Sequence, residues 1–164
     1  MVAVAVGVFV ANILTIHRLS EMQENAVRAI TDADDKIVLN EQEKQILDLA
    51  CGRVLLFHLN GLMIFGVAKA IAREHSAIDN YDVLLVDLAE VPVMGVTSSL
   101  AIENAIKEAL DVGREVIVVG ATGKIKHRLE KLGIAGLIPE SHWIGDRLIA
   151  LKEGLAIVQK RQKI

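Results

Sequence analysis

The segment most able to bind a cofactor is a glycine turn between an apolar run and a basic one. In VIVVGATGKIKHRL, residues 116–129, Gly120 and Gly123 stand where a strand would pass into a helix, as in a dinucleotide-binding fingerprint. That fingerprint needs a third glycine for close helix–strand packing, and Lys126 occupies its place. Too little chain follows for the second half of a dinucleotide fold. A tight turn is therefore favoured, and Gly120, Thr122 and Gly123 are kept as a possible contact for an anion or a nucleotide.

A second candidate is the hydroxyl-rich loop EVPVMGVTSSLAIENAI, residues 90–106, which follows an apolar run and opens a helical pattern. Hydroxyl side chains at a helix start can cap the first turn by accepting hydrogen bonds from its free N–H groups. The same N–H groups can instead receive an anion or a phosphate. Both interpretations remain open. The candidate regulatory loop comprises Gly95, Val96, Thr97, Ser98 and Ser99.

The other chemically active side chains form no catalytic or metal-binding pattern. The five histidines are scattered and lack zinc-motif spacing. Asp87 has no second carboxylate beside it for acid–base chemistry, and no nucleophile-elbow motif surrounds a serine. Asp32, Asp34 and Asp35 lack the glycine and the distal glutamate of a calcium loop. We therefore expect no catalytic residue, metal or cofactor, and we expect that the protein is not an enzyme.

The elements that would position these residues alternate between strands and helices. Short β-branched apolar runs predict buried strands over residues 53–59, 81–88 and 114–121, with a weaker strand around 37–39. Apolar residues at three- and four-residue steps predict helices over 66–75, 98–112, 124–132 and 145–160. This order predicts an α/β domain with a mostly parallel or mixed sheet covered by helices.

The chain begins with an uncharged apolar segment, residues 2–16. A membrane-spanning helix needs about 20 such residues, so the segment is too short to cross alone. It is expected to be the cytoplasmic end of a transmembrane helix or an arm that packs on the domain or on a second copy. His17 and Arg18 follow at once, which favours the membrane helix under the positive-inside rule.

A linking helix is predicted after this segment, because Leu19, Met22, Ala26 and Ile30 recur at three- and four-residue steps. The predicted division of the chain is therefore residues 1–31, the end of the membrane helix with its linking helix, and residues 32–164, the α/β domain.

Composition narrows the possible partners. The chain has 164 residues and a net charge of −3, and no basic stripe with interleaved aromatics occurs, so nucleic acid is not expected as a partner. The single cysteine, Cys51, excludes an internal disulfide.

Three segments taken in order resemble one known domain family. They are RVLLFHLNGLMIFGVAKAI at 53–71, YDVLLVDLAEVPVMGVTSSLAIENAIKEA at 81–109 and GREVIVVGATGKIKHRLEKLGI at 113–134. Together they are similar to the STAS domain of SulP-family anion transporters. The phrases GRVLLF…MIFGVAKAIAREH and EVPVMGVTSSLAIENAI are most similar to cyanobacterial sodium-dependent bicarbonate transporters of that family.

The resemblance implies a STAS-type α/β fold and a regulatory and dimerisation domain on the cytoplasmic face of the plasma membrane. The implied partners are a second copy and the membrane portion of the same transporter. Free-standing STAS proteins, the anti-sigma-factor antagonists, instead switch by phosphorylation of a serine that follows a loop aspartate. Here Gly95 stands in the aspartate position and Val96 in the serine position, with Thr97 as the next hydroxyl. A free-standing switch of this kind is the alternative function.

Overall fold

The computed structural model describes residues 26–31, 39–64 and 67–163. The strands of the sheet are β1 (Val27–Ile30), β2 (Val54–Asn60), β3 (Val83–Glu90), β4 (Glu115–Val119) and β5 (Trp143–Ile144). The α-helices are α2 (Glu41–Ala50), α3 (Val67–Ser76), α4 (Val96–Asp111), α5 (Gly123–Lys131) and α6 (Arg147–Arg161). Two short 3₁₀ turns, Ile134–Gly136 and Glu140–His142, lie between α5 and β5.

The five strands form one mixed sheet in the order β1-β2-β3-β4-β5. Strand β1 runs antiparallel to β2, and the other neighbouring pairs are parallel. All loops that follow β2, β3 and β4 therefore leave the sheet at its carboxyl end, the edge where ligands bind in many open α/β sheets. The predicted α/β class and the three central strands are confirmed.

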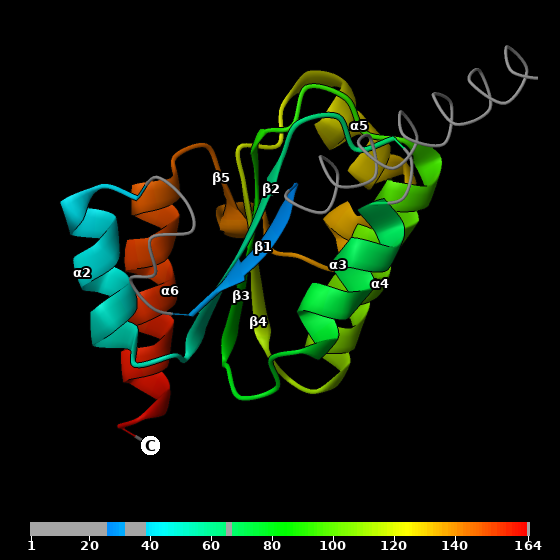
Figure 1. The fold of residues 1–164 in the computed structure, drawn as a ribbon. Helices are drawn as coiled ribbons and strands as arrows, with labels where there is room; N and C mark the ends of the chain where they lie inside the picture. The colour runs from blue at the N-terminus through cyan, green and yellow to red at the C-terminus, as the bar shows by residue number, and fades with distance from the viewer. Residues whose placement is uncertain (1–25, 32–38, 65–66, 164) are drawn as a thin grey trace, which may run out of the picture.

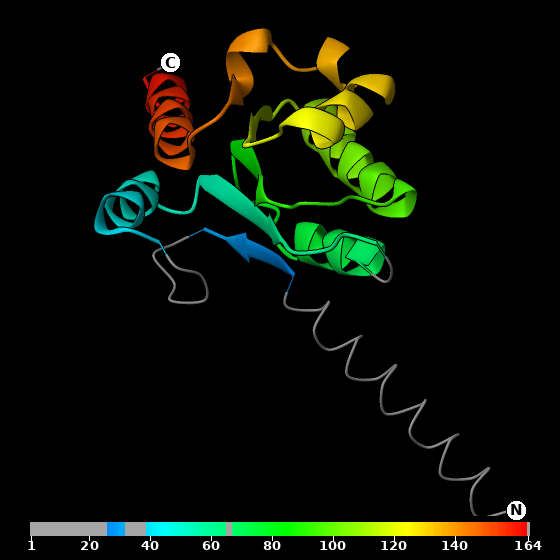
Figure 2. The same cartoon turned by 90° about the horizontal axis from the view of Figure 1, so that it is seen from above.

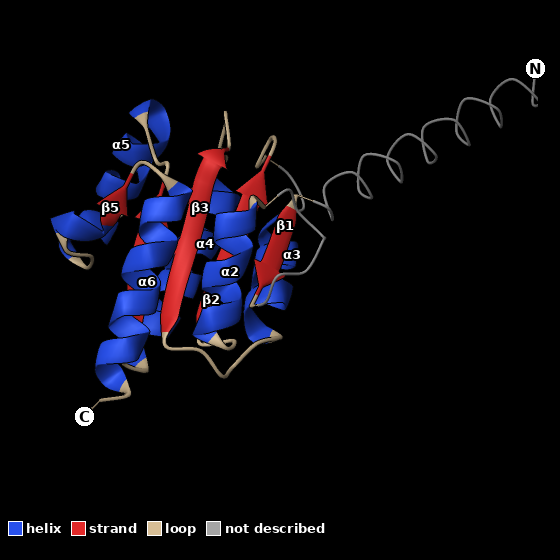
Figure 3. Cartoon of the chain, turned by 90° about the vertical axis from the view of Figure 1, so that its left-hand side faces the viewer, coloured by secondary structure: helices blue, strands red, loops and turns tan. Residues whose placement is uncertain are grey.

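Helices cover both faces of the sheet (Figures 1 and 2). Helices α3, α4 and α5 lie over one face, whose apolar core includes Phe57, Leu84 and Ile102. Helices α2 and α6 pack side by side over the other face, whose core includes Leu56, Leu85 and Leu151 (Figure 3). Because both faces are covered, β2 and β3 are apolar throughout most of their length rather than alternating.

The linking helix predicted across residues 26–30 is wrong, because Val27–Ile30 is an edge strand paired with β2. The helical spacing runs through Ala26 and Ile30, but Ala26 lies in the turn before the strand and packs in the opposite core from Ile30, so the two share no face. Val27 and Ile30 are buried on opposite faces, as the period of two requires. The sheet thus begins before residue 32, within the part of the chain assigned to the linker.

Helix α2 and strand β5 were not predicted from the sequence. Helix α2 begins with a capping box, in which Asn40 Oδ1 accepts from the Glu43 N–H and Glu43 Oε2 accepts from the Asn40 N–H, both at 2.8 Å. Leu39, which the sequence places in a weak strand, lies outside the strands, directly before this cap. The rest of that strand prediction, residues 37 and 38, lies outside the described residues.

The predicted apolar helix of residues 2–16 also lies outside the described residues. Within the residues that are described, no helix is both long enough and apolar enough to cross a membrane.

Candidate functional site

The loop between β3 and α4 is held against the loop between β2 and α3. The Met63 N–H donates to Val93 O at 2.9 Å, and the Gly95 N–H donates to Met63 O at 2.6 Å. A Cβ on Gly95 would lie 3.1 Å from the carbonyl oxygens of Met63 and Ile64, closer than side chains normally approach. Glycine at position 95 is thus explained by this close backbone approach, in the place where the family pattern has an aspartate.

The hydroxyls after Gly95 do not cap helix α4, so the capping interpretation is wrong. The helix begins at Val96 with Gly95 as its N-cap residue, so all three hydroxyls lie inside the first turn, past the capping position. Ser99 is buried and its Oγ donates backward to Gly95 O at 2.7 Å. Ser98 Oγ is buried without a hydrogen-bond partner among the described residues. Thr97 is exposed, and it lines a shallow groove between α3 and α4.

The turn between β4 and α5 is close to the same loop. Gly120 has a φ of +66°, and a Cβ there would lie 2.6 Å from atoms of Ala89 at the end of β3. Its N–H donates to Ile144 O at 2.9 Å, which ties the turn to β5. Thr122 is the N-cap residue of α5 but makes no side-chain capping bond, and Gly123 has a φ of +52°. The turn predicted from the glycine pattern is confirmed, while ligand binding at this turn stays a prediction.

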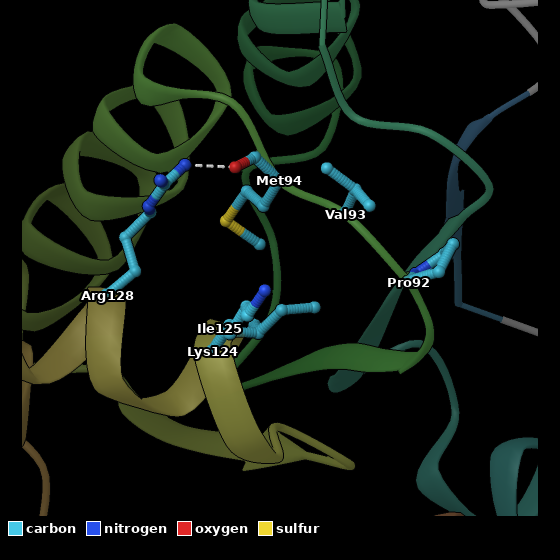
Figure 4. A pocket seen from close by; sticks show the side chains of 6 residues that line it. All are labelled: Pro92, Val93, Met94, Lys124, Ile125 and Arg128. Carbon is cyan, nitrogen blue, oxygen red and sulfur yellow. Dashed lines mark hydrogen bonds between the residues drawn. The ribbon is translucent and has the colours of Figure 1, made fainter.

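A hollow of about 160 Å³ separates the two candidate segments (Figure 4). Arg128 of α5 reaches across it and donates to the carbonyl of Met94, next to Gly95. Apart from Arg128 and Lys124, the side chains that line the hollow are apolar. Arg128 and Lys124 make the lining cationic as well as apolar. The lining residues are Pro92, Val93, Met94, Lys124, Ile125 and Arg128.

None of the eight predicted site residues lines this hollow; they flank it. Residues 95–99 lie beyond Met94, and Gly120, Thr122 and Gly123 precede Lys124. The structure thus brings the two candidate segments to one edge of the sheet, joined through Arg128 and Met94. The sequence carried a signal for two of the lining residues. Lys124 and Arg128 are basic residues four positions apart, so their side chains lie on one face of a helix.

A buried network of charges behind this edge was missed from the sequence. Asp87, which is fully buried, accepts from His58 Nδ1 at 3.0 Å, from Arg147 at 3.2 Å and from the Ala89 N–H at 3.1 Å. Arg147 also donates to Glu43 at 2.9 Å. The network therefore ties the first turns of α2 and α6 to the carboxyl ends of β2 and β3.

The electrostatics of this network favour its charged forms. Burial by itself raises the pKa of Asp87, but the hydrogen bonds from His58 and from the Ala89 N–H, with the positive charge of Arg147, outweigh it and hold the pKa below its usual value. Burial likewise disfavours the charged form of Arg147, and the carboxylates of Glu43 and Asp87 more than compensate, so its pKa is raised. The pairing is consistent with the rule that buried charges must be matched.

Two strand sequences carried the signal for this network. RVLLFHL and DVLLVDL, residues 53–59 and 82–88, are nearly the same apolar pattern with opposite charges at matching places. In the sheet His58 is the register partner of Asp87, and the Arg53 Nε donates to Asp82 at 2.6 Å. Among the described residues, no group of three His, Cys, Asp or Glu side chains is arranged to hold a metal ion.

Comparison with known proteins identifies close relatives. The chain is 58% identical over 153 residues to the bicarbonate transporter BicA of Synechocystis sp., and 56% identical over 155 residues to BicA of Picosynechococcus sp.. These matches cover 93% and 94% of this chain but 27% of each relative, so the chain spans about a quarter of their length.

The fold comparison agrees. A crystal structure of a sulfate transporter family protein from Wolinella succinogenes superposes with a TM-score of 0.58 at 19% identity, covering 80% of this chain and 98% of that one. At this identity the likeness concerns the fold alone. The model of the STAS domain family matches residues 45–148, which include both candidate segments and most of the buried network. The chain belongs to the STAS domain family.

Proposed function

We propose that this chain is the cytoplasmic regulatory and dimerisation domain of a SulP-type inorganic anion transporter that carries bicarbonate. The observation that carries the proposal is the 58% identity to the bicarbonate transporter BicA over 93% of this chain. Identity of this extent is much higher than fold likeness requires, so it supports a shared role as well as a shared fold. The membrane portion of the protein would move the anion, and this domain would lie at the cytoplasmic face of the plasma membrane.

The regulatory role is assigned to the loop of residues 95–99 and to the edge of the sheet that it shares with Gly120, Thr122 and Gly123. The loop is fixed at one side by the Met63–Gly95 hydrogen bond and at the other by the bond from Arg128 to Met94. A partner that contacts this loop would therefore act on both helix α4, which begins at Val96, and helix α5, which carries Arg128. Thr97 is the hydroxyl of this loop that is exposed for contact or modification, since Ser98 and Ser99 are buried.

A segment exchange tests the proposal. Residues 27–164 of this chain would replace the matching part of the Synechocystis relative, and bicarbonate uptake would be measured in cells that have no other bicarbonate uptake system. Because the two sequences are so similar, we expect uptake within about twofold of the unexchanged protein. A deletion of the same segment is the control. Membrane-inserted exchange protein without uptake would contradict the assignment.

Size and location supply an independent test. An antibody against residues 53–134 should detect, in the source organism, a membrane-fraction band several times larger than the 17.8 kDa of this chain. A soluble band near 17.8 kDa would contradict the transporter proposal and favour the free-standing switch protein.

The free-standing switch is the less favoured function. Such a switch needs a hydroxyl in the position that Val96 occupies, and valine has none, although Val96 is 65% exposed there.

Dimerisation is tested by sedimentation velocity of the chain, for which we expect a mass twice that of one copy in the micromolar range.

A further inference from the structure

Four large aliphatic side chains are exposed at the carboxyl end of the sheet. Leu62 lies in the loop after β2, Val93 in the loop after β3, and the other two in the first turns of α4, with exposed fractions of 43–65%. We call these four residues the apolar rim: Leu62, Val93, Val96 and Leu100.

The rim residues lie on neighbouring segments. The Met63 N–H donates to Val93 O, which places the Leu62 loop directly beside Val93. Val96 and Leu100 are four residues apart on α4, so their side chains lie on one face of that helix. Large exposed aliphatic side chains gathered on neighbouring segments are typical of an interaction surface.

Two exposed lysines lie in the first turn of α5, at this end of the sheet. Lys124 lines the hollow together with Val93 of the rim, whereas Lys126 lies over Trp143, with its Nζ 5.9 Å from the centre of that ring. In the described part of the chain neither lysine is paired with a carboxylate. Exposed acids at this end include Glu90, whose Oε2 lies 3.8 Å from the buried His58, and Asp146, the N-cap residue of α6. The positive charge nearest the rim is therefore that of Lys124.

The number of residues between them limits how far this edge can be from the apolar segment of residues 2–16. The Asn60 N–H donates to Ala26 O at 2.9 Å, so the chain enters the sheet beside the end of β2, next to Leu62. Ten residues, 17–26, separate Ile16 from Val27. Ten fully extended residues reach at most about 35 Å, which is therefore the largest possible distance between Ile16 and the start of β1.

We propose that the apolar rim, with Lys124 and Lys126, forms a surface that lies on the anionic phospholipid headgroups of the membrane. The lysines attract the headgroup phosphates, and the aliphatic side chains enter the boundary below them. This inference rests on the proposed function, since it requires the chain to be held at a membrane. Two observations favour lipid over a second copy of this chain: the unpaired lysines at this end of the sheet, and the short stretch of chain between it and the apolar segment.

The test compares two valines at opposite ends of α4. Val96 and Val112 are both 65% exposed, and Val112 is at the far end of the helix. In a Cys51→Ser background, Val96→Cys and Val112→Cys would each carry an environment-sensitive fluorophore. The labelled full chain would be reconstituted with vesicles of phosphatidylcholine, with or without phosphatidylglycerol and doxyl-labelled lipid.

We expect doxyl quenching at position 96 on vesicles that contain phosphatidylglycerol, and none at position 112. Lys124→Gln with Lys126→Gln should reduce the quenching on the order of twentyfold, since each lysine near an anionic surface strengthens binding by about fivefold. Lys160→Gln with Lys163→Gln, the same change in charge at the end of α6, should leave it unchanged.

Flotation of the vesicles shows whether the chain is bound to lipid when quenching is absent. A chain that floats with the vesicles but shows no quenching at position 96 overturns this inference and leaves the proposed function standing. Protection of position 96 from an aqueous quencher without lipid quenching also overturns it, and identifies a protein as the occupant. A chain that does not float also overturns this inference, whereas the proposed function is tested separately by the uptake and antibody experiments.

Discussion

Asp87 is the residue that joins His58 and Arg147 in the buried charge network. It lies in the central sheet and accepts hydrogen bonds from the backbone, from β2 and from α6. Asp87→Asn removes the negative charge and leaves Arg147 with Glu43 as its remaining carboxylate. We expect a loss of about 3 kcal/mol in the free energy of unfolding, the usual consequence of breaking a buried charge pair. Urea denaturation followed by circular dichroism at neutral pH measures it.

The same residue predicts how stability depends on pH. Because the folded-state pKa of Asp87 lies below its unfolded value of about 3.9, its contribution is fully present above that value and is lost as the pH falls through the folded pKa. The difference between the wild type and Asp87→Asn should therefore be constant from neutral pH to about pH 5 and shrink in stronger acid. Glu41→Gln, in an exposed pair with Lys44, is the control and should cost less than about 1 kcal/mol. Equal losses for the two variants would contradict the prediction.

The three hydroxyls of the first turn of α4 should respond differently to alanine. Ser99→Ala loses the bond to Gly95 O and should cost about 1 kcal/mol. Ser98→Ala removes a buried hydroxyl that has no partner among the described residues, so stability should stay equal or increase. Thr97→Ala should change stability by less than about 0.5 kcal/mol, because Thr97 is exposed and caps nothing. Thermal unfolding of the three variants checks the order, and a large loss for Thr97→Ala would restore it as a cap.

At the scale of elements, the turn from β4 to α5 depends on Gly120. An alanine there would have to adopt a positive φ and would also collide with Ala89. Gly113 has a similar φ of +77°, but no heavy atom lies within 4 Å of the place that a Cβ would take, so Gly113→Ala isolates the conformational cost of about 1 kcal/mol.

We expect Gly120→Ala to cost at least about 2 kcal/mol more than Gly113→Ala, because the strand ends must separate. Chemical denaturation of both variants measures the difference. Equal costs would mean that the approach of β3 to the turn is not rigid.

Whole-molecule stability should depend on where the chain is cut. A chain that begins at residue 32, the predicted domain boundary, lacks β1 and leaves the edge of β2 unpaired. It also loses the burial of Val27 and Ile30, each worth roughly 1.5–3 kcal/mol. We expect this chain to unfold at lower urea concentration than one that begins at residue 24, and to aggregate through the exposed edge. Equal midpoints would show that β1 is dispensable.

Much of the fold followed from local patterns. The apolar runs in β2, β3 and β4 are long enough to leave no choice but a strand buried on both faces. The periodicity of α3, α4, α5 and α6 was equally clear. Strand β1 was mistaken for helix because a helical spacing of apolar residues runs into it from residues 19–26, and four residues are too few to show a period of their own; pairing with β2 makes it a strand. Strand β5 has two residues, too few for any pattern to register.

By itself the sequence determined the α/β class, the family and the two segments that meet at the carboxyl edge of the sheet. These are local properties, carried by periodicity and by short motifs. The tertiary structure alone decided which hydroxyl is exposed, since a shift of two residues in the start of α4 exchanges cap positions for interior ones. It alone joined Glu43 to Arg147, because that contact spans 104 positions and depends on how two helices pack on one sheet. Contacts of that range are set by packing, which no local pattern records.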